Sequence, residues 1–214
     1  MFELSLIKTC TNFFSTCALH YRAYKILIRN KKSYLHSSGW MLSLAEGRPM
    51  DLQENAIPWM NFNVIELLDQ RLDKDLTLFE FGSGYSTRFY ANRVKAVTSL
   101  EYDDHWYQLL KSQVSENVNL IFRPEDVDGE YCRVIAEQKQ KFDVVVVDGR
   151  DRVNCIKQSL AALSDRGVIL LDDSQRERYN DGVVFAESDG FRVLHMSGLK
   201  ATGGRSVRTT ILYR

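Results

Sequence analysis

Two glycines and two acids, placed after apolar runs, are the residues in this chain best suited to chemistry. An apolar run carries Glu80 and leads into Gly82 and Gly84, and about twenty residues later the run 96–100 ends in Glu101. Glycines after a strand permit a tight turn and let a ligand lie against bare backbone. An acid after the second strand can accept hydrogen bonds from both ribose hydroxyls. The pattern predicts a nucleotide pocket at the carboxyl edge of a parallel sheet.

The residues that follow the glycines argue against a dinucleotide. A dinucleotide site has a third glycine, which allows close helix packing and contact with the pyrophosphate, whereas residues 85–87 of this chain are Tyr-Ser-Thr. The carboxylate of Glu80 would also repel a pyrophosphate, but it suits a cationic ligand. S-adenosylmethionine carries an ammonium and a sulfonium and has no phosphate. We therefore expect S-adenosylmethionine rather than NAD.

Over residues 77–213 the chain resembles the class I S-adenosylmethionine-dependent methyltransferases. The resemblance rests on residues 80–84, Glu101, residues 147–149 and residues 170–173. Residues 39–40, 47–51 and 57–60, together with 79–87 and 101–106, further resemble a bacterial methyltransferase-like family. It implies that the methionine part lies near the glycines, the ribose at Glu101 and the adenine after the third strand. The cofactor-binding residues that it implies are Glu80, Gly82, Ser83, Gly84, Tyr85, Ser86, Thr87, Glu101, Tyr102, Glu125, Asp126 and Asp148.

Further acids follow the fourth and fifth predicted strands. Asp148 ends the fourth strand and Asp173 follows the fifth, so both should face one crevice, where carboxylates repel one another unless a cation joins them. The pattern is similar to the metal site of catechol-type O-methyltransferases, which implies Mg²⁺ or Mn²⁺ at Asp148, Asp173 and Ser174. Ser174 stands where that family has Asn, and Arg150 stands where it has its lysine base. Without a metal, we expect Asp148 or Asp151 to be the catalytic base.

Alternating strands and helices must position these residues. The predicted strands are 77–81, 96–101, 118–122, 142–147, 167–172, 191–196 and 207–213, and helices are expected near 86–93, 104–115, 129–139, 153–163 and 175–187. The unbroken β-branched fourth strand is typical of a parallel strand that is buried on both faces. The link 198–206 is too short for a crossover helix, so the last strand should be antiparallel. The predicted fold class is α/β, a doubly wound, Rossmann-like sheet of seven strands with an antiparallel last strand.

The start of the chain is predicted to be an N-terminal helical and irregular extension, residues 1–60, before a methyltransferase domain, residues 61–214. Residues 1–30 are predicted to be helical, and turn signals predict irregular structure over 35–57. Residues 20–32 combine basic and apolar side chains with no acid. Such a helix either binds a membrane surface or packs on the domain or on a second subunit of a homodimer.

Bulk composition narrows the range of partners. Lys+Arg and Asp+Glu both number 28, so a net charge of zero gives no general reason to expect nucleic-acid binding. Four separated cysteines form no CxxC pair, which favours reduced thiols in a cytoplasmic protein and argues against structural zinc. No apolar run reaches the roughly 18 residues of a membrane span. We expect a cytoplasmic protein, with peripheral contact at the inner membrane face as an alternative.

Three functions remain open from the sequence. The first is a methyltransferase that acts on a hydroxyl of a small molecule or glycan, with an acceptor site built from residues 33–60, 174–182 and 198–206. The second is a nicotinamide-dependent oxidoreductase, which the missing third glycine disfavours. The third is a binding protein that keeps the fold without catalysis, because no obvious base is present. Separately, an alternative interpretation of Asp151 and Arg152 is that they merely form a surface ion pair.

Overall fold

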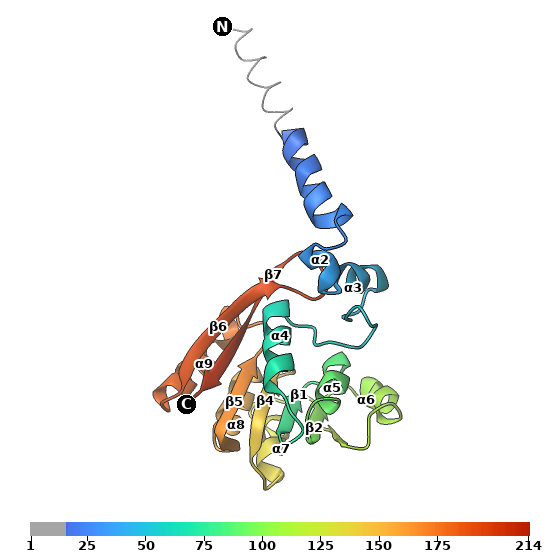
Figure 1. Ribbon diagram of the computed structural model, residues 1–214. Helices are drawn as coiled ribbons and strands as arrows, with labels where there is room; N and C mark the ends of the chain where they lie inside the picture. The colour runs from blue at the N-terminus through green and yellow to red at the C-terminus, as the bar shows by residue number, and fades with distance from the viewer. Residues whose placement is uncertain (1–15) are drawn as a thin grey trace.

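The computed structural model describes residues 16–214 (Figure 1). The strands are β1 (Thr77–Phe81), β2 (Ala96–Glu101), β3 (Val118–Phe122), β4 (Phe142–Val147), β5 (Leu163–Leu171), β6 (Arg192–Leu199) and β7 (Ser206–Tyr213). They form one seven-stranded sheet in the order β3-β2-β1-β4-β5-β7-β6. Strands β1 to β5 run parallel, and β7 pairs antiparallel with both β5 and β6. The predicted fold class, including the antiparallel last strand, is confirmed.

Helices cover both faces of this sheet. They are η1 (Tyr24–Arg29), α2 (Tyr34–Ser37), α3 (Trp40–Glu46), α4 (Phe62–Arg71), α5 (Tyr85–Ala91), α6 (Asp104–Lys111), α7 (Glu130–Glu137), α8 (Arg152–Leu160), η2 (Glu177–Tyr179) and α9 (Asn180–Ser188). Successive strand residues point to opposite faces. Phe79 and Val145 therefore pack with α7, α8 and α9, whereas Leu78 and Val144 pack with α4 and α5. Both apolar faces are covered, which leaves the carboxyl edge of the sheet for a site.

The prediction of irregular structure over residues 35–57 is wrong in part, because this segment contains most of α2 and all of α3. The glycines that indicate turns lie at the two ends of α3, with left-handed φ angles of 81° at Gly39 and 67° at Gly47. Ser43 is buried in α3, and its hydroxyl donates to the carbonyl of Met50 and accepts from the Met50 amide. The turn signals therefore mark where a short helix begins and ends.

Other predicted helices differ mainly at their ends. The helix expected over 175–187 is divided into the short η2 and α9. Of the helix expected over 1–30, residues 1–15 lie outside the described part of the chain, and residues 16–29 are helical. The division between an extension, 1–60, and a domain, 61–214, stays a prediction.

A buried asparagine joins α4 to the β6–β7 hairpin. The Asn61 Oδ1 atom accepts from the amide of Val64 at 3.2 Å, which caps the first turn of α4. Its Nδ2 atom donates to the carbonyl of Met196 at 3.1 Å and lies 3.4 Å from the hydroxyl of Thr209. Both the donor and the acceptor groups of this side chain are thus used, and they fix the start of α4 against the two antiparallel strands.

We expect Asn61→Ala to lower the free energy of unfolding by about 2 kcal/mol, because the change removes a helix cap and leaves buried partners unpaired. Urea denaturation measures the difference. Asn180→Ala is the matched control, since Asn180 is exposed at the first residue of α9, and its effect should stay within about 0.5 kcal/mol. Equal losses in the two variants would contradict the role assigned to Asn61.

Candidate active site

A cleft of about 850 Å³ opens at the carboxyl ends of the parallel strands. This size lies within the range of small-molecule and cofactor sites. The predicted cofactor residues that line it are Gly82, Ser83, Gly84, Tyr85, Ser86, Glu101, Tyr102 and Asp148. The remaining predicted cofactor residues, Glu80, Thr87, Glu125 and Asp126, lie outside the lining. The sheet thus brings together most of the predicted pocket from β1, β2 and β4.

Two loops meet backbone to backbone at the floor of the cleft. Gly82 follows β1 and has φ 95°, a left-handed conformation that favours glycine. A Cβ atom on Gly82 would lie 2.9 Å from the Cα atom of Gly149, in the loop after β4. A side chain at position 82 would therefore force the two loops apart. The floor that a ligand meets here is bare backbone.

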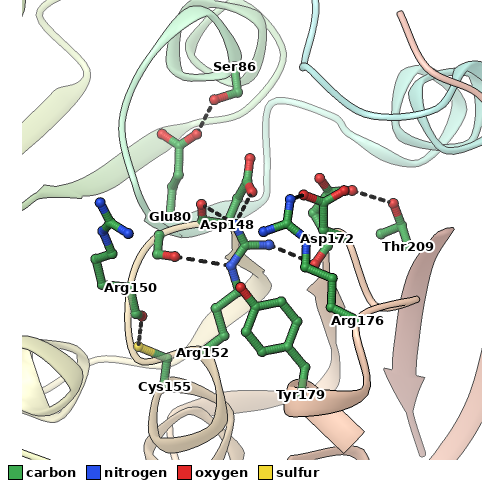
Figure 2. Close-up of polar contacts among 12 residues, drawn as sticks. Glu80, Ser86, Asp148, Arg150, Arg152, Cys155, Asp172, Arg176, Tyr179 and Thr209 are labelled. Atoms are coloured by element: carbon green, nitrogen blue, oxygen red, sulfur yellow. Dashed lines mark hydrogen bonds and ion pairs between the residues drawn. The ribbon is translucent and has the colours of Figure 1, made fainter. Parts of the chain in front are cut away.

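Glu80 supports this loop from beneath. Its side chain is fully buried, and its carboxylate accepts hydrogen bonds from the hydroxyls of Ser86, Thr87 and Ser99. Ser99 is the direct partner of Glu80 in the β1–β2 register, and Figure 2 shows the contact with Ser86. Burial raises the pKa of Glu80 to about 7, against the opposing effect of the three hydroxyls. Glu80 therefore holds the start of α5 and does not line the cleft.

Thr87 occupies the place of the third glycine in a dinucleotide-binding loop. Its side chain is buried, and its hydroxyl oxygen accepts from the amide of Gly84 at 3.0 Å while donating to Glu80 at 2.6 Å. The hydroxyl of Thr87 and the carboxyl group of Glu80 therefore lie at the start of α5, where a dinucleotide-binding loop would leave bare backbone open to a pyrophosphate.

Glu101 joins the two loops that flank the predicted ribose site. Its carboxylate accepts from the amides of Tyr102 and Asp103, both at 2.9 Å, and from the amide of Ser83 at 3.1 Å. The fourth donor is the hydroxyl of Ser83. A hydroxyl can rotate away, whereas the three amides are fixed by the backbone. The carboxylate can thus offer one acceptor position to a ribose hydroxyl and still hold both loops.

The wall beside Tyr102 is built from an arginine that lies against its ring. The Arg150 guanidinium carbon lies 4.5 Å from the centre of the Tyr102 ring, and Arg150 also pairs with Glu125 at 2.9 Å. Arg150 thus links Glu125 to Tyr102, on the wall where the adenine is predicted to lie. Asp126 instead accepts from the amide of Glu130 at 2.7 Å, at the start of α7. Its role is to cap that helix.

Arg152 connects the ends of β4 and β5, and the expectation that it forms a surface ion pair with Asp151 is wrong. Its guanidinium is buried and donates to the carbonyls of Asp148, Gly149 and Asp172 at 2.7–3.0 Å. It also pairs with the Asp148 carboxylate at 2.8 Å, as Figure 2 shows. The four-residue spacing of Asp148 and Arg152 is a signal that the sequence contained.

The Asp148 carboxylate is half-buried at the centre of the cleft, with 31% of its side chain exposed. Burial raises its pKa, and Arg152 opposes this effect. Its neighbour Asp172 is buried and accepts from the hydroxyl of Thr209 at 2.7 Å. Burial, together with the charge of Asp148, raises the pKa of Asp172 to about 7. Of these two carboxylates, Asp148 is the one that reaches the cleft.

Each of the three residues predicted to hold Mg²⁺ or Mn²⁺ is bound to another partner. Asp148 is paired with Arg152, and the Asp173 carboxylate faces Arg176. The Ser174 hydroxyl binds the β7 carbonyl of Arg208 at 3.1 Å. Among residues 16–214 no group of three or more His, Cys, Asp or Glu is placed to hold a metal ion. Arginines therefore occupy the positions where a cation would balance these carboxylates, and the arrangement does not fit the metal.

Asp151 also lines the cleft, but its carboxylate is used to hold loops together. It accepts from the amide of Asp128 at 2.8 Å and from the side chain of Asn154 at 2.9 Å. Asp151 itself has a left-handed φ of 43° at the start of α8. These contacts suit a positioning residue.

One end of the cleft is lined by further aromatic and basic side chains. The sequence analysis covered four of them only as members of the segments 33–60 and 174–182, namely Trp59, Arg176, Arg178 and Tyr179. Trp59 lies edge-on to Tyr85, with ring centres 6.3 Å apart. Arg178 donates to the Tyr179 hydroxyl at 2.9 Å, and no described carboxylate pairs with it. Arg176 lies beside them. This end offers flat apolar surface and a guanidinium without a counter-charge, which suits a ring-shaped or anionic acceptor.

Several solved structures with a similar fold carry the name of a methyltransferase. A protein from Klebsiella pneumoniae assigned as an O-methyltransferase superposes with a TM-score of 0.56 at 17% identity, over 92% of this chain and 96% of its own. A Streptococcus mutans protein assigned as a methyltransferase, in complex with S-adenosylhomocysteine, gives 0.52 at 16% identity, over 70% and 94%. A precorrin-6y C5,15-methyltransferase from Geobacter metallireducens gives 0.51 at 21% identity, over 71% and 86%.

No protein-family model and no curated protein sequence matches the chain. The structural likenesses are all below 25% identity, so they establish the fold. The chain has the fold of the class I S-adenosylmethionine-dependent methyltransferases, as the sequence pattern predicted.

The raised pKa of Glu80 predicts a pH-dependent stability difference. The folded-state pKa of about 7 lies above the ordinary value, so the wild-type chain loses stability as the pH rises from about 4.5 through 7. Glu80→Gln does not titrate there. The stability of Glu80→Gln relative to wild type should therefore rise by roughly 2–3 kcal/mol between pH 5 and pH 8. The difference in melting temperature between the two proteins should rise with it.

Thermal unfolding followed by circular dichroism across this pH range measures the difference. Glu187→Gln is the control, because Glu187 is exposed on α9, and its offset from wild type should stay constant. A Glu80→Gln offset that is constant with pH, or that is largest at pH 5, would contradict the burial of a carboxyl group at this position.

Proposed function

We propose that the protein is an S-adenosylmethionine-dependent methyltransferase that acts on a hydroxyl group of a small molecule or glycan. The observation that carries this proposal is the position of Glu101. It is a carboxylate on the cleft wall with one rotatable donor, next to bare backbone at Gly82 and Gly149. These residues fit a nucleoside with two free ribose hydroxyls. The S-adenosylhomocysteine complex of the Streptococcus mutans protein with the same fold supports the same cofactor.

A nicotinamide dinucleotide fits this cleft less well. Its pyrophosphate would meet the start of α5, where the hydroxyl of Thr87 and the carboxyl group of Glu80 already take the space and the hydrogen bonds. The positive end of a helix favours anions only where its amides are free to bind them. The amide of Gly84 is bound to Thr87 instead.

When bound, S-adenosylmethionine supplies a methyl group on a positively charged sulfur. The chain must then hold an acceptor hydroxyl in line and receive its proton. Asp148 is suited to the second task, because it is exposed to the cleft and its pKa is raised by burial. Arg152 fixes its position and opposes the rise of its pKa. No step in this scheme needs a metal.

The acceptor itself would bind between Trp59 and Tyr179. The Trp59 ring offers a face for a sugar or a phenol, and the guanidinium of Arg178 offers a charged donor. These residues come from two of the segments that were predicted to form the acceptor site, 33–60 and 174–182.

Glu101→Gln should weaken S-adenosylhomocysteine binding by roughly 10- to 100-fold, because hydrogen bonds to a charged acceptor contribute about 1.5–3 kcal/mol. Isothermal titration calorimetry measures the dissociation constant. Glu125→Gln is the control, and it should change binding by less than about fivefold, since it only breaks an exposed ion pair with Arg150. Unchanged affinity in Glu101→Gln would show that the ribose site is assigned wrongly.

Asp148→Asn should lower turnover by at least about 100-fold while S-adenosylhomocysteine still binds, because the general base is lost. A panel of phenols and glycans, read out by release of S-adenosylhomocysteine, measures turnover. Asp165→Asn, at an exposed aspartate outside the cleft lining, is the control and should keep the activity. Excess chelator should leave the wild-type rate unchanged.

Two outcomes of these experiments would favour a different function, a metal-dependent enzyme or a binding protein. A rate that collapses with chelator and returns with Mg²⁺ or Mn²⁺ would restore the metal that the geometry disfavours. A protein that binds S-adenosylhomocysteine but turns over no member of the panel would favour a binding protein that keeps the fold alone.

A further inference from the structure

The helix formed by residues 16–29, here called the basic helix, contains no buried residue. Its large apolar side chains Leu19, Tyr21, Tyr24, Ile26 and Leu27 are between 45% and 65% exposed. The η1 part of the helix contains no buried residue. Figure 1 shows it leaving the domain beside α2 and pointing away from the sheet. Several neighbouring large apolar side chains left in water are typical of a binding surface.

The charge on this segment is of one sign. Arg22, Lys25 and Arg29 follow one another at three- and four-residue spacing, which is typical of one side of a helix, and Lys31 and Lys32 come directly after it. The sequence contains no Asp or Glu from residue 4 to residue 45, although the whole chain has a net charge of zero. Positive charge is thus concentrated on the same segment as the exposed apolar side chains.

The basic helix is attached to the domain in a defined way. The hydroxyl of Ser33 donates to the carbonyl of Leu27 at 2.7 Å, and the His36 ring nitrogen binds the carbonyl of Ile28 at 2.6 Å. These contacts satisfy carbonyls in the last turn of the helix and join it to α2. The direction of the helix is therefore set by its contacts with the first residues of α2.

A series of contacts links the attachment of the basic helix to a residue that lines the cleft. Just after α2, the Trp40 ring nitrogen donates to the carbonyl of Gly203 at 2.9 Å. The neighbouring Thr202 hydroxyl accepts from the Trp59 ring nitrogen, and Trp59 lines the cleft. A surface that is bound by the basic helix would thus lie near the acceptor end of the cleft.

We propose that the basic helix, with Lys31 and Lys32, binds the surface of an anionic lipid bilayer. Apolar side chains enter the interface while Lys and Arg bind the headgroups, at about 1 kcal/mol per basic residue. In the described part of the chain no helix has the length and apolar content needed to cross a membrane. The contact that we propose is with the membrane surface. The further idea that this lipid surface presents the methyl acceptor rests on the proposed function. Lipid binding itself does not depend on that function.

Vesicle flotation of the full chain tests the proposal, without cofactor or acceptor. Vesicles of phosphatidylglycerol and phosphatidylcholine in equal parts should bind the protein, and pure phosphatidylcholine vesicles should bind it far less. The triple variant Arg22→Gln, Lys25→Gln and Arg29→Gln should bind the anionic vesicles roughly 100-fold more weakly. The matched control Lys95→Gln, Lys111→Gln and Lys157→Gln removes three exposed charges on the domain and should bind as wild type does.

A second triple variant, Leu19→Ser, Ile26→Ser and Leu27→Ser, separates lipid from a second copy of the chain. It should lose vesicle binding and leave the melting temperature unchanged, because these side chains are exposed. Sedimentation equilibrium without lipid should give one mass for this variant and for wild type. Equal binding to neutral and anionic vesicles, no binding to either, or a wild-type dimer that this variant abolishes would overturn the proposal. The vesicle result does not depend on S-adenosylhomocysteine binding, so it can fail while the proposed function holds.

Discussion

The contact between the backbone at Gly82 and the backbone at Gly149 is the constraint on which the site depends. An added Cβ atom at Gly82 would lie 2.9 Å from Gly149, so the loops after β1 and β4 can be this close only without a side chain. This approach puts Ser83 within reach of Glu101 on one side and Asp148 at the cleft on the other. The predicted nucleoside pocket and the predicted reaction centre therefore share one floor.

Burial of charge is the second organising feature. Glu80, Asp172 and Arg152 are all buried at or below the carboxyl edge of the sheet. Burial raises the pKa values of Glu80 and Asp172 to about 7. Arg152 is instead surrounded by three carbonyls and a carboxylate. Arginine stays charged in such a place because its own pKa is very high. It balances Asp148 without a metal, which explains how acids can gather at this edge.

Much of the fold could be predicted because each signal was local. Strands β1 to β4 match their predicted ranges, since their apolar runs are bounded by turn residues or charges. The short helices α2 and α3 could not be predicted, because the glycines that end α3 look like turn signals in the sequence. The position of Glu101 at the end of the second strand was also predictable. The clamp made by Arg152 was only partly predictable. Its four-residue spacing from Asp148 is visible in the sequence, but its partner Asp172 follows another strand and meets Arg152 only after folding.

A crystal structure of the protein with S-adenosylhomocysteine tests the central claim most directly. We predict that the nucleoside lies over Gly82 and Gly149, with its ribose hydroxyls within hydrogen-bond distance of the Glu101 carboxylate and the Ser83 hydroxyl turned away. The sulfur should then point toward Asp148. A ligand bound elsewhere, or a ribose that does not reach Glu101, would contradict the assignment of this cleft as a cofactor site.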